Sequence, residues 1–171
     1  MKKLLIVVDY QKDFVDGALG FSGAEKLAGP IQEKMRAYRD RGDEVAFTFD
    51  THGADYLETQ EGKNLPVPHC AKGSKGWELY PPLEVLDGER TFCKPAFGSA
   101  ELFDYLRENV YESIELVGLV SSICVISNAI LAKTAQPETP ILVDSACTDG
   151  FDPELHQAAL KVMAGLQIQI L

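Results

Sequence analysis

The segment Leu4-Leu5-Ile6-Val7-Val8 is a continuous apolar run that ends at Asp9. A parallel strand that helices cover on both faces buries all of its side chains, and an unbroken apolar run is typical of such a strand. Further strands are predicted at residues 44–49, 90–93, 113–117, 141–143 and 167–170.

Helical patterns lie between these strands, at residues 24–41, 99–109, 122–134 and 153–164. In the first of them Ile31, Met35 and Tyr38 recur at helical spacing, and Ser99 is placed to cap the second. Strands that alternate with helices form right-handed βαβ units around a parallel sheet. The sequence therefore predicts an α/β fold with three α/β/α layers around a mostly parallel, Rossmann-like sheet. No repeat or linker is visible, so residues 1–171 are expected to form a single domain.

The charge and the apolar runs exclude several kinds of partner. The chain has 171 residues and a formal net charge of −10. An acidic surface repels phosphate, so neither nucleic acid nor an anionic membrane is expected as a partner. The apolar run before Asp9 is too short for a signal peptide, and none approaches the ~20 residues of a membrane span. We therefore expect a cytoplasmic protein whose four cysteines, which form no CxxC pair, are free thiols.

Several polar residues follow the predicted strands at their carboxyl ends. Asp9, Asp50 and Asp144 each come at the end of a strand, and the turn 120–124 follows another. Ligands of open parallel sheets bind beyond the carboxyl ends of the strands. The segment 52–88, rich in Gly and Pro, predicts a long loop, and such loops in compact domains are often functional. We therefore expect a functional site at this edge of the sheet.

Cys124 is a candidate nucleophile, because it lies between a predicted strand and a predicted helix. A thiol in the first turn of a helix is close to the positive end of the helix dipole and to unpaired backbone N–H groups, and both favour the thiolate. The same N–H groups can stabilise an oxyanion. A small buried cysteine that packs the helix onto the sheet is the alternative interpretation.

Asp9 and Lys94 are candidate partners of this cysteine. Asp9 can act as a general base for the thiol proton, or it can simply cap a turn. Lys94 follows a short predicted strand and can pair with Asp9 and hold a thiolate, although most lysines are exposed on the surface. Neither residue decides the chemistry by itself.

Three segments taken together resemble the isochorismatase-like cysteine hydrolases in order and spacing. They are Val8-Asp9-Tyr-Gln-Lys-Asp-Phe14, Lys94-Pro-Ala-Phe-Gly-Ser-Ala-Glu-Leu-Phe103 and Gly118 to Val125. The resemblance covers nearly the whole chain and implies the isochorismatase-like hydrolase fold. It also implies that Asp9, Lys94 and Cys124 form a catalytic triad. The peptide between Leu119 and Val120 is then expected to be cis, with the N–H groups of Val120 and Cys124 forming the oxyanion hole.

A second group of residues has the chemistry of metal ligands. Asp50 and His52 alternate at the end of a predicted strand, and His69 can return from the long loop to join them. Imidazole and carboxylate suit zinc, manganese or iron, whereas surface histidines are the alternative interpretation. The group resembles the metal site of the nicotinamidases, which implies a divalent metal ion with zinc as the first choice. On that resemblance Glu61 is the fourth ligand, and Glu58 is the alternative.

The resemblance to nicotinamidases also implies a substrate class. Those enzymes hydrolyse nicotinamide to nicotinate and ammonia, so we expect a small-molecule amide and a thioester on Cys124. Many of them carry an aromatic residue before the Pro-x-His segment, where this chain has Leu65. The wall against the substrate is therefore expected from Phe14, together with Phe97 or Trp77, although such aromatics more often belong to the core.

Other functions stay open from the sequence. An isochorismatase-type vinyl-ether hydrolase does not need Cys124, and amidases that act on carbamoyl or ureido compounds share the triad. A non-catalytic binding module would keep the fold without turnover. Relatives often form dimers or larger assemblies, so a homo-oligomer is also among the expectations.

The segment from Asp144 to Gly150 resembles the family's loop beside the site, after a strand. On this interpretation Asp144 supports the loop and Cys147 is structural. A plain surface turn closed by Gly150 is the alternative.

Overall fold

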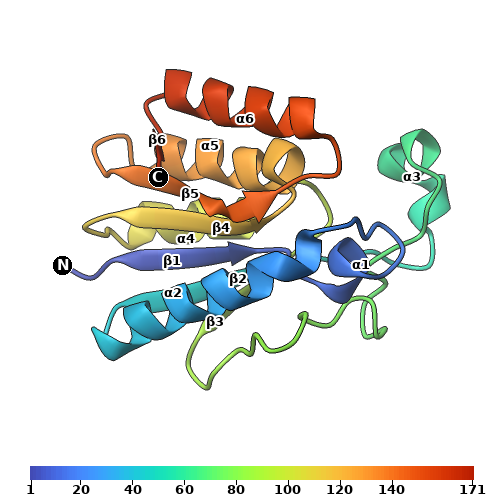
Figure 1. The fold of residues 1–171 in the computed structure, drawn as a ribbon, viewed down its shortest axis with the longest axis horizontal. Helices are drawn as coiled ribbons and strands as arrows, with labels where there is room; N and C mark the ends of the chain where they lie inside the picture. Colours follow the sequence, from blue (N-terminus) through green and yellow to red (C-terminus); the bar gives the residue numbers. More distant parts are fainter.

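Six strands form one sheet in the order β3-β2-β1-β4-β5-β6, and every pair of neighbours is parallel (Figure 1). A computed structural model describes residues 1–171. The strands are β1 (Leu4–Val8), β2 (Glu44–Asp50), β3 (Arg90–Lys94), β4 (Ile114–Leu119), β5 (Ile141–Asp149) and β6 (Gln169–Ile170). This sheet confirms the Rossmann-like α/β fold expected from the sequence.

Helices cover both faces of the sheet. They are α1 (Lys12–Val15), α2 (Ala28–Asp40), α3 (Gln60–Asn64), α4 (Ala100–Glu108), α5 (Ile126–Ala135) and α6 (Pro153–Gly165), with the short segments η1 (Ala24–Leu27), η2 (Tyr56–Glu58) and η3 (Ser121–Val125). Helix α2 packs on one face and α4, α5 and α6 pack on the other, while α3 stands beyond the carboxyl ends of the strands (Figure 1). None of these helices combines the length and the apolar character needed to cross a bilayer.

Alternate residues of β1 face opposite layers. Leu4 and Ile6 pack with α4, α5 and α6 in one hydrophobic cluster, and Leu5 and Val7 pack with α2 in a second. All four side chains are buried. Full burial of such a side chain stabilises the fold by about 1.5–3 kcal/mol. Because both faces of β1 gain this stabilisation, the strand has no polar positions.

Two predicted helices begin with a different helical geometry. The predicted helix 24–41 consists of η1 followed by α2, and the predicted helix 122–134 begins as the π-helical segment η3 before α5. The predicted cap of α4 is confirmed, since the Ser99 hydroxyl accepts a hydrogen bond of 3.1 Å from the Leu102 N–H.

The expectation of a loop or surface turn at residues 144–150 is wrong. Strand β5 continues to Asp149, and after a register shift its Thr148 pairs with Gly118 of β4. Thr148 and Asp149 pair with β4, and the Ser145 N–H donates to the Leu171 carbonyl on the other side, and such pairing leaves no mark in the hydrophobic pattern. Asp144 and Cys147 are therefore strand residues.

The long loop predicted at residues 52–88 contains short helices. The segments η2 and α3 form within it, and the Thr59 hydroxyl caps α3 by accepting a hydrogen bond of 3.0 Å from the Gly62 N–H. Both helices are too short for a hydrophobic period to reveal them.

The order of the strands creates a crevice beside β1. The chain builds β2 and β3 on one side of β1 and then crosses to β4 on the other side. Ligands of such sheets bind at the point where the strand order reverses. Asp9 follows β1 and η3 follows β4, so both lie at this point.

Candidate active site

Asp9, Lys94 and Cys124 meet at the carboxyl edge of the sheet. The Lys94 Nζ lies 2.6 Å from Asp9 Oδ2 and donates a hydrogen bond of 3.5 Å to the Cys124 sulfur. Each of the three residues is at most 5% exposed. The exposed surface lysine considered from the sequence is therefore excluded, and the structure brings together the three residues of the expected triad.

The backbone and side chain of Asp9 are tightly held. Its φ angle is +44°, in the left-handed region that few residues other than glycine adopt. The Thr48 hydroxyl donates a hydrogen bond of 2.6 Å to Asp9 Oδ1, which leaves Oδ2 facing Lys94. Burial raises the pKa of Asp9, against the opposing charge of Lys94. Burial alone would lower the pKa of Lys94, but the negative charges of Asp9, Cys124 and Asp50 raise it, so Lys94 stays protonated.

Cys124 lies in η3, at the start of the helical segment that follows β4. The position that was expected to favour a thiolate is also buried within the fold. Burial raises the pKa of the Cys124 thiol well above its usual value, and the charge of Asp9 raises it further while Lys94 lowers it. The thiol is therefore protonated at rest and needs a base. The peptide between Leu119 and Val120 is cis, as the resemblance implied.

All four cysteines are free thiols, as expected: Cys70, Cys93, Cys124 and Cys147. Cys93 is exposed on β3, while Cys70 and Cys147 are buried in the cluster that packs against α2. Of the four, only Cys124 lines the cavity described below.

Asp50, His52, Glu61 and His69 form one compact group, with four ligand atoms that all lie within 4.8 Å of one another. The Nε2 atoms of His52 and His69 lie 2.9 and 3.1 Å from Asp50 Oδ2. The same two nitrogens lie 3.6 Å from Glu61 Oε1. Two imidazoles and two carboxylates converging on one point are suited to a divalent metal ion. The structure brings Glu61, and not the exposed Glu58, into this group.

Neighbouring groups orient these ligands. The second nitrogen of His69, Nδ1, donates a hydrogen bond of 2.8 Å to the Val67 carbonyl, which orients Nε2 toward the carboxylates of the metal-ligand group. The ring of Tyr56 packs edge-on against both histidines. Burial by itself would raise the pKa of Asp50, but hydrogen bonds from His52 and His69 outweigh burial and hold it well below its usual value. Asp50 is therefore a carboxylate, the form that binds a cation.

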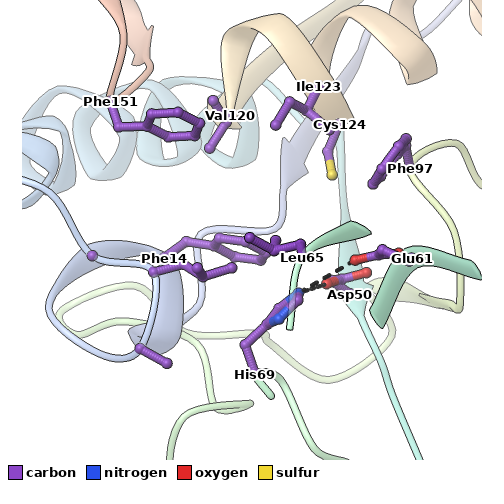
Figure 2. Close-up of a pocket in the computed structure, with 13 residues that line it drawn as sticks. Phe14, Asp50, Glu61, Leu65, His69, Phe97, Val120, Ile123, Cys124 and Phe151 are labelled. Atoms are coloured by element: carbon purple, nitrogen blue, oxygen red, sulfur yellow. Dashed lines mark hydrogen bonds and ion pairs between the residues drawn. The ribbon is translucent and has the colours of Figure 1, made fainter. Parts of the chain in front are cut away.

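Cys124 and three members of the metal-ligand group line one cavity of about 350 Å³. Figure 2 shows the sulfur of Cys124 pointing toward the carboxylates of Asp50 and Glu61. The lining residues are Phe14, Ala18, Leu19, Gly20, Asp50, Glu61, Leu65, His69, Phe97, Val120, Ile123, Cys124 and Phe151. None of them is an arginine or a lysine, most of them are apolar, and the ionisable ones are Asp50, Glu61, His69 and Cys124.

The cavity includes Phe14 and Phe97 from the sequence expectation, but not Trp77. Trp77 packs against Phe49, with 5.2 Å between ring centroids, and its indole N–H donates to Thr51. It therefore belongs to the supporting structure. Further apolar lining comes from Leu19, Ile123 and Phe151, which carry no sequence signal because their segments meet only in the folded chain.

Residues 3–170 match the isochorismatase domain. The chain belongs to the isochorismatase family. Within this family the nicotinamidase/pyrazinamidase of Mycobacterium tuberculosis is 28% identical over an alignment that covers 98% of this chain and 97% of the relative.

Solved structures of isochorismatase-family proteins share the fold over their full length. The pyrazinamidase of Pyrococcus horikoshii in complex with zinc is 25% identical, with a TM-score of 0.88, and the match covers 100% of this chain and 99% of that one. The nicotinamidase/pyrazinamidase of Bacillus subtilis is 29% identical, with a TM-score of 0.88 and 99% of each chain covered. The family resemblance read from three short segments is therefore confirmed.

The sequence does not single out three buried polar residues of this isochorismatase-family site, Gln11, Thr48 and Asn128. The Gln11 amide donates to the carbonyls of Asp50 and Trp77, each at 2.9 Å, and accepts from the Asp50 N–H at 2.8 Å. Gln11 at least lies inside one of the segments that carry the resemblance. Thr48 and Asn128 give no such signal, because their roles depend on partners far away in the chain.

Proposed function

We propose that this protein is a cysteine-dependent amidohydrolase that converts nicotinamide and water to nicotinate and ammonia. The observation that carries the proposal is the shared cavity of Cys124 and the Asp50–Glu61–His69 group. An aromatic amide whose ring nitrogen faces this group places its carboxamide near the sulfur. The relatives named nicotinamidase and pyrazinamidase support the same substrate class.

The reaction proceeds through a thioester. Asp9 takes the proton of the buried Cys124 thiol, and the sulfur attacks the amide carbon. The backbone N–H groups of Val120 and Cys124 stabilise the negative oxygen of the tetrahedral intermediate. Asp9 then gives the proton to the leaving nitrogen, so ammonia departs and a thioester remains. A water molecule that gives a proton to Asp9 attacks the thioester, which releases nicotinate and restores the thiol.

Lys94 supports these steps without exchanging a proton. Its ammonium group lies beside both Asp9 and the Cys124 sulfur, so it stabilises whichever of the two is negative. Proton transfer from Cys124 to Asp9 therefore moves the negative charge from one neighbour of the Lys94 ammonium group to the other, so the ion pair with Lys94 is kept throughout.

We assign the metal ligands as Asp50, His52, Glu61 and His69, with zinc as the first choice and manganese or iron as alternatives. The two imidazoles and two carboxylates, already oriented around one point, fit such an ion. When bound, a divalent ion supplies a Lewis acid for a ring nitrogen. Phe14 and Phe97 bind the faces of the aromatic ring.

The site favours an aromatic amide over the alternative substrates. An isochorismatase-type reaction does not need Cys124, whereas here Cys124 and three members of the metal-ligand group line one cavity. A ring nitrogen can bind the metal ion, and this favours an aromatic amide over carbamoyl or ureido compounds. We also propose a cytoplasmic location, where the four free thiols stay reduced.

Ammonia release from nicotinamide tests this function. Wild type, Cys124→Ala and Cys93→Ala are compared, each before and after treatment with a chelator. Cys93 is an exposed thiol next to Lys94 in sequence and provides a matched control. We expect wild type and Cys93→Ala to release ammonia, and Cys124→Ala or chelated wild type to lose it. Full activity of Cys124→Ala, or no activity of folded, metal-loaded wild type, would refute the proposal.

A further inference from the structure

The third histidine of the chain, His156, lies outside the metal-ligand group. It sits in the first turns of α6, and its Nδ1 shares a hydrogen bond of 2.9 Å with the Ser121 hydroxyl. Ser121 is fully buried and follows Val120 directly. Of these residues Val120 lines the cavity, whereas His156 and Ser121 do not. The hydrogen bond therefore joins a helix outside the cavity to the turn that forms its wall.

The segment before α6 also packs closely against this turn. A Cβ atom added to the buried Gly150 would lie 3.1 Å from Val120 Cγ1 and 3.3 Å from Ser121 Oγ. Asp152 fixes the start of α6, because its carboxylate accepts hydrogen bonds from two N–H groups of the first turn at 2.9 and 3.1 Å. The partner that His156 offers to Ser121 is therefore held on a rigid helix.

The two ends of the turn have separate supports. At the far end, the Asn128 amide donates a hydrogen bond of 2.8 Å to the Cys124 carbonyl. At the near end, the side chain that reaches the turn from another element is His156, through Ser121. Each N–H assigned to the oxyanion hole, that of Val120 and that of Cys124, thus lies next to a different anchor.

We propose that His156 is a positioning residue for amide hydrolysis, which holds the Val120 N–H toward the developing oxyanion through its hydrogen bond to Ser121. The inference rests on the proposed function, since it needs the oxyanion hole to be used. Donors of an oxyanion hole stabilise the transition state only when they are already aimed at it, and a displacement of about 1 Å can cost about 100-fold in rate. The nicotinamide ground state, which has no oxyanion, does not need this alignment.

The test compares His156→Ala, Ser121→Ala and the double variant with wild type in nicotinamide hydrolysis. We expect each single variant to lower kcat about 10- to 100-fold and to change KM by less than about threefold. The double variant is expected to match the single ones, because both remove the same bond. His156→Asn, which keeps a polar group near the position of Nδ1, should recover most of the rate. Gln157→Ala, at the exposed neighbour on α6, should behave as wild type.

A binding measurement separates positioning from general loss of structure. Pyridine-3-carboxaldehyde accepts the Cys124 sulfur and becomes tetrahedral, with its oxygen where the oxyanion forms, whereas nicotinate stays planar. We expect His156→Ala to weaken the aldehyde at least about tenfold and to leave nicotinate binding nearly unchanged. Gly150→Ala, whose added methyl group crowds Val120 and the Ser121 hydroxyl that bonds to His156, should shift the two affinities in the same way.

The outcomes distinguish the two proposals. A wild type that hydrolyses nicotinamide while His156→Ala keeps its kcat and its affinity for the aldehyde would overturn the positioning role alone. Equal loss of aldehyde and nicotinate binding in His156→Ala would also overturn it, since that pattern belongs to a structural role. A wild type that does not hydrolyse nicotinamide would overturn the proposed function and this inference with it.

Discussion

The Lys94 ammonium group lies 2.6 Å from Asp9 Oδ2, and solvent reaches neither side chain to more than 1%. Removing one partner of a buried ion pair leaves an uncompensated charge, at a cost of about 3–5 kcal/mol. We therefore expect Lys94→Met to lose both activity and this much free energy of unfolding, measured by urea denaturation. The double variant Asp9→Asn/Lys94→Met should be more stable than Lys94→Met alone, though still inactive. A Lys94→Met protein as stable as wild type would contradict the buried pair.

Asn128 joins the helical segment that contains Cys124 to the segment that carries Phe97. Its side-chain amide donates to the carbonyls of Cys124 and Phe97 and accepts from the Ser99 N–H, at 2.8, 3.1 and 3.0 Å. Each buried polar group left without a partner costs about 1–3 kcal/mol. We expect Asn128→Ala to lower the free energy of unfolding by at least about 2 kcal/mol. Asn109→Ala removes one exposed hydrogen bond and should change it by less than about 0.5 kcal/mol.

Glu61 and Glu58 form a matched pair for testing the metal ligands. Only Glu61 lies within reach of His52 and His69, while Glu58 is exposed on η2. Loss of an outer contact of a metal site commonly weakens binding about 10- to 100-fold, and loss of a direct ligand should cost at least as much. We expect Glu61→Gln to lose zinc affinity by this factor in a competition with a chromogenic chelator. Glu58→Gln should bind as wild type, and the reverse result would reassign the ligand.

Asp144 on β5 pairs with Lys34 of α2 at 2.7 Å, and Lys34 also pairs with the buried Glu115. Burial would raise the pKa of Asp144, but the hydrogen bonds from Lys34 and the Ala146 N–H and the charge of Lys34 together outweigh it, so its pKa lies below the usual 3.8. A carboxyl with a lowered pKa in the folded state stabilises the protein above pH 3.8, and this contribution is lost as the pH falls through its folded pKa.

The corresponding measurement is urea denaturation at neutral pH and at about pH 3. The wild type should lose more stability in acid than Asp144→Asn, because the variant has no carboxylate to protonate. The pKa of Lys34 shifts in the opposite direction from that of Asp144. Burial would lower the pKa of Lys34, but hydrogen bonds and charges from Asp144 and Glu115 raise it above 10.5. Its contribution is therefore present in neutral solution and is lost only as the pH rises through the raised value. An equal acid loss in both proteins would show that this pair does not stabilise the fold.

Local sequence determined the elements that depend on short-range patterns. The apolar run of β1 and the periodic helices α2, α4 and α6 were readable because burial on a strand or helix leaves a regular spacing. The continuation of β5 to Asp149 and the short helix α3 were not readable. Both depend on hydrogen bonds, to β4 in one case and to the Thr59 cap in the other, that hydrophobicity does not encode.

The residues of the site also divide into those that the sequence indicated and those that only the structure placed. The sequence placed Asp9, Asp50 and Cys124 at the carboxyl edge, because each follows a strand and parallel strands end together. Lys94 was a candidate because it follows a short predicted strand, and the resemblance joined it to Asp9 and Cys124 as a triad. Only the tertiary structure showed that Lys94, from the outer strand β3, reaches past β2 to Asp9. It also chose Glu61 over Glu58 and excluded Trp77 from the cavity, since the path of a long loop is set by packing.

The protonation of Cys124 shows most clearly why local sequence does not determine the chemistry of a site. The sequence determined that the cysteine starts a helix, and a helix dipole is a local property that favours the thiolate. Whether the thiol ionises also depends on how much water it loses and on which charges surround it. Those quantities come from the packing of β1, β3 and η3 around one point, and they raise the pKa of Cys124 instead. The sequence by itself determined which groups are present, and the tertiary structure decided their ionisation and their partners.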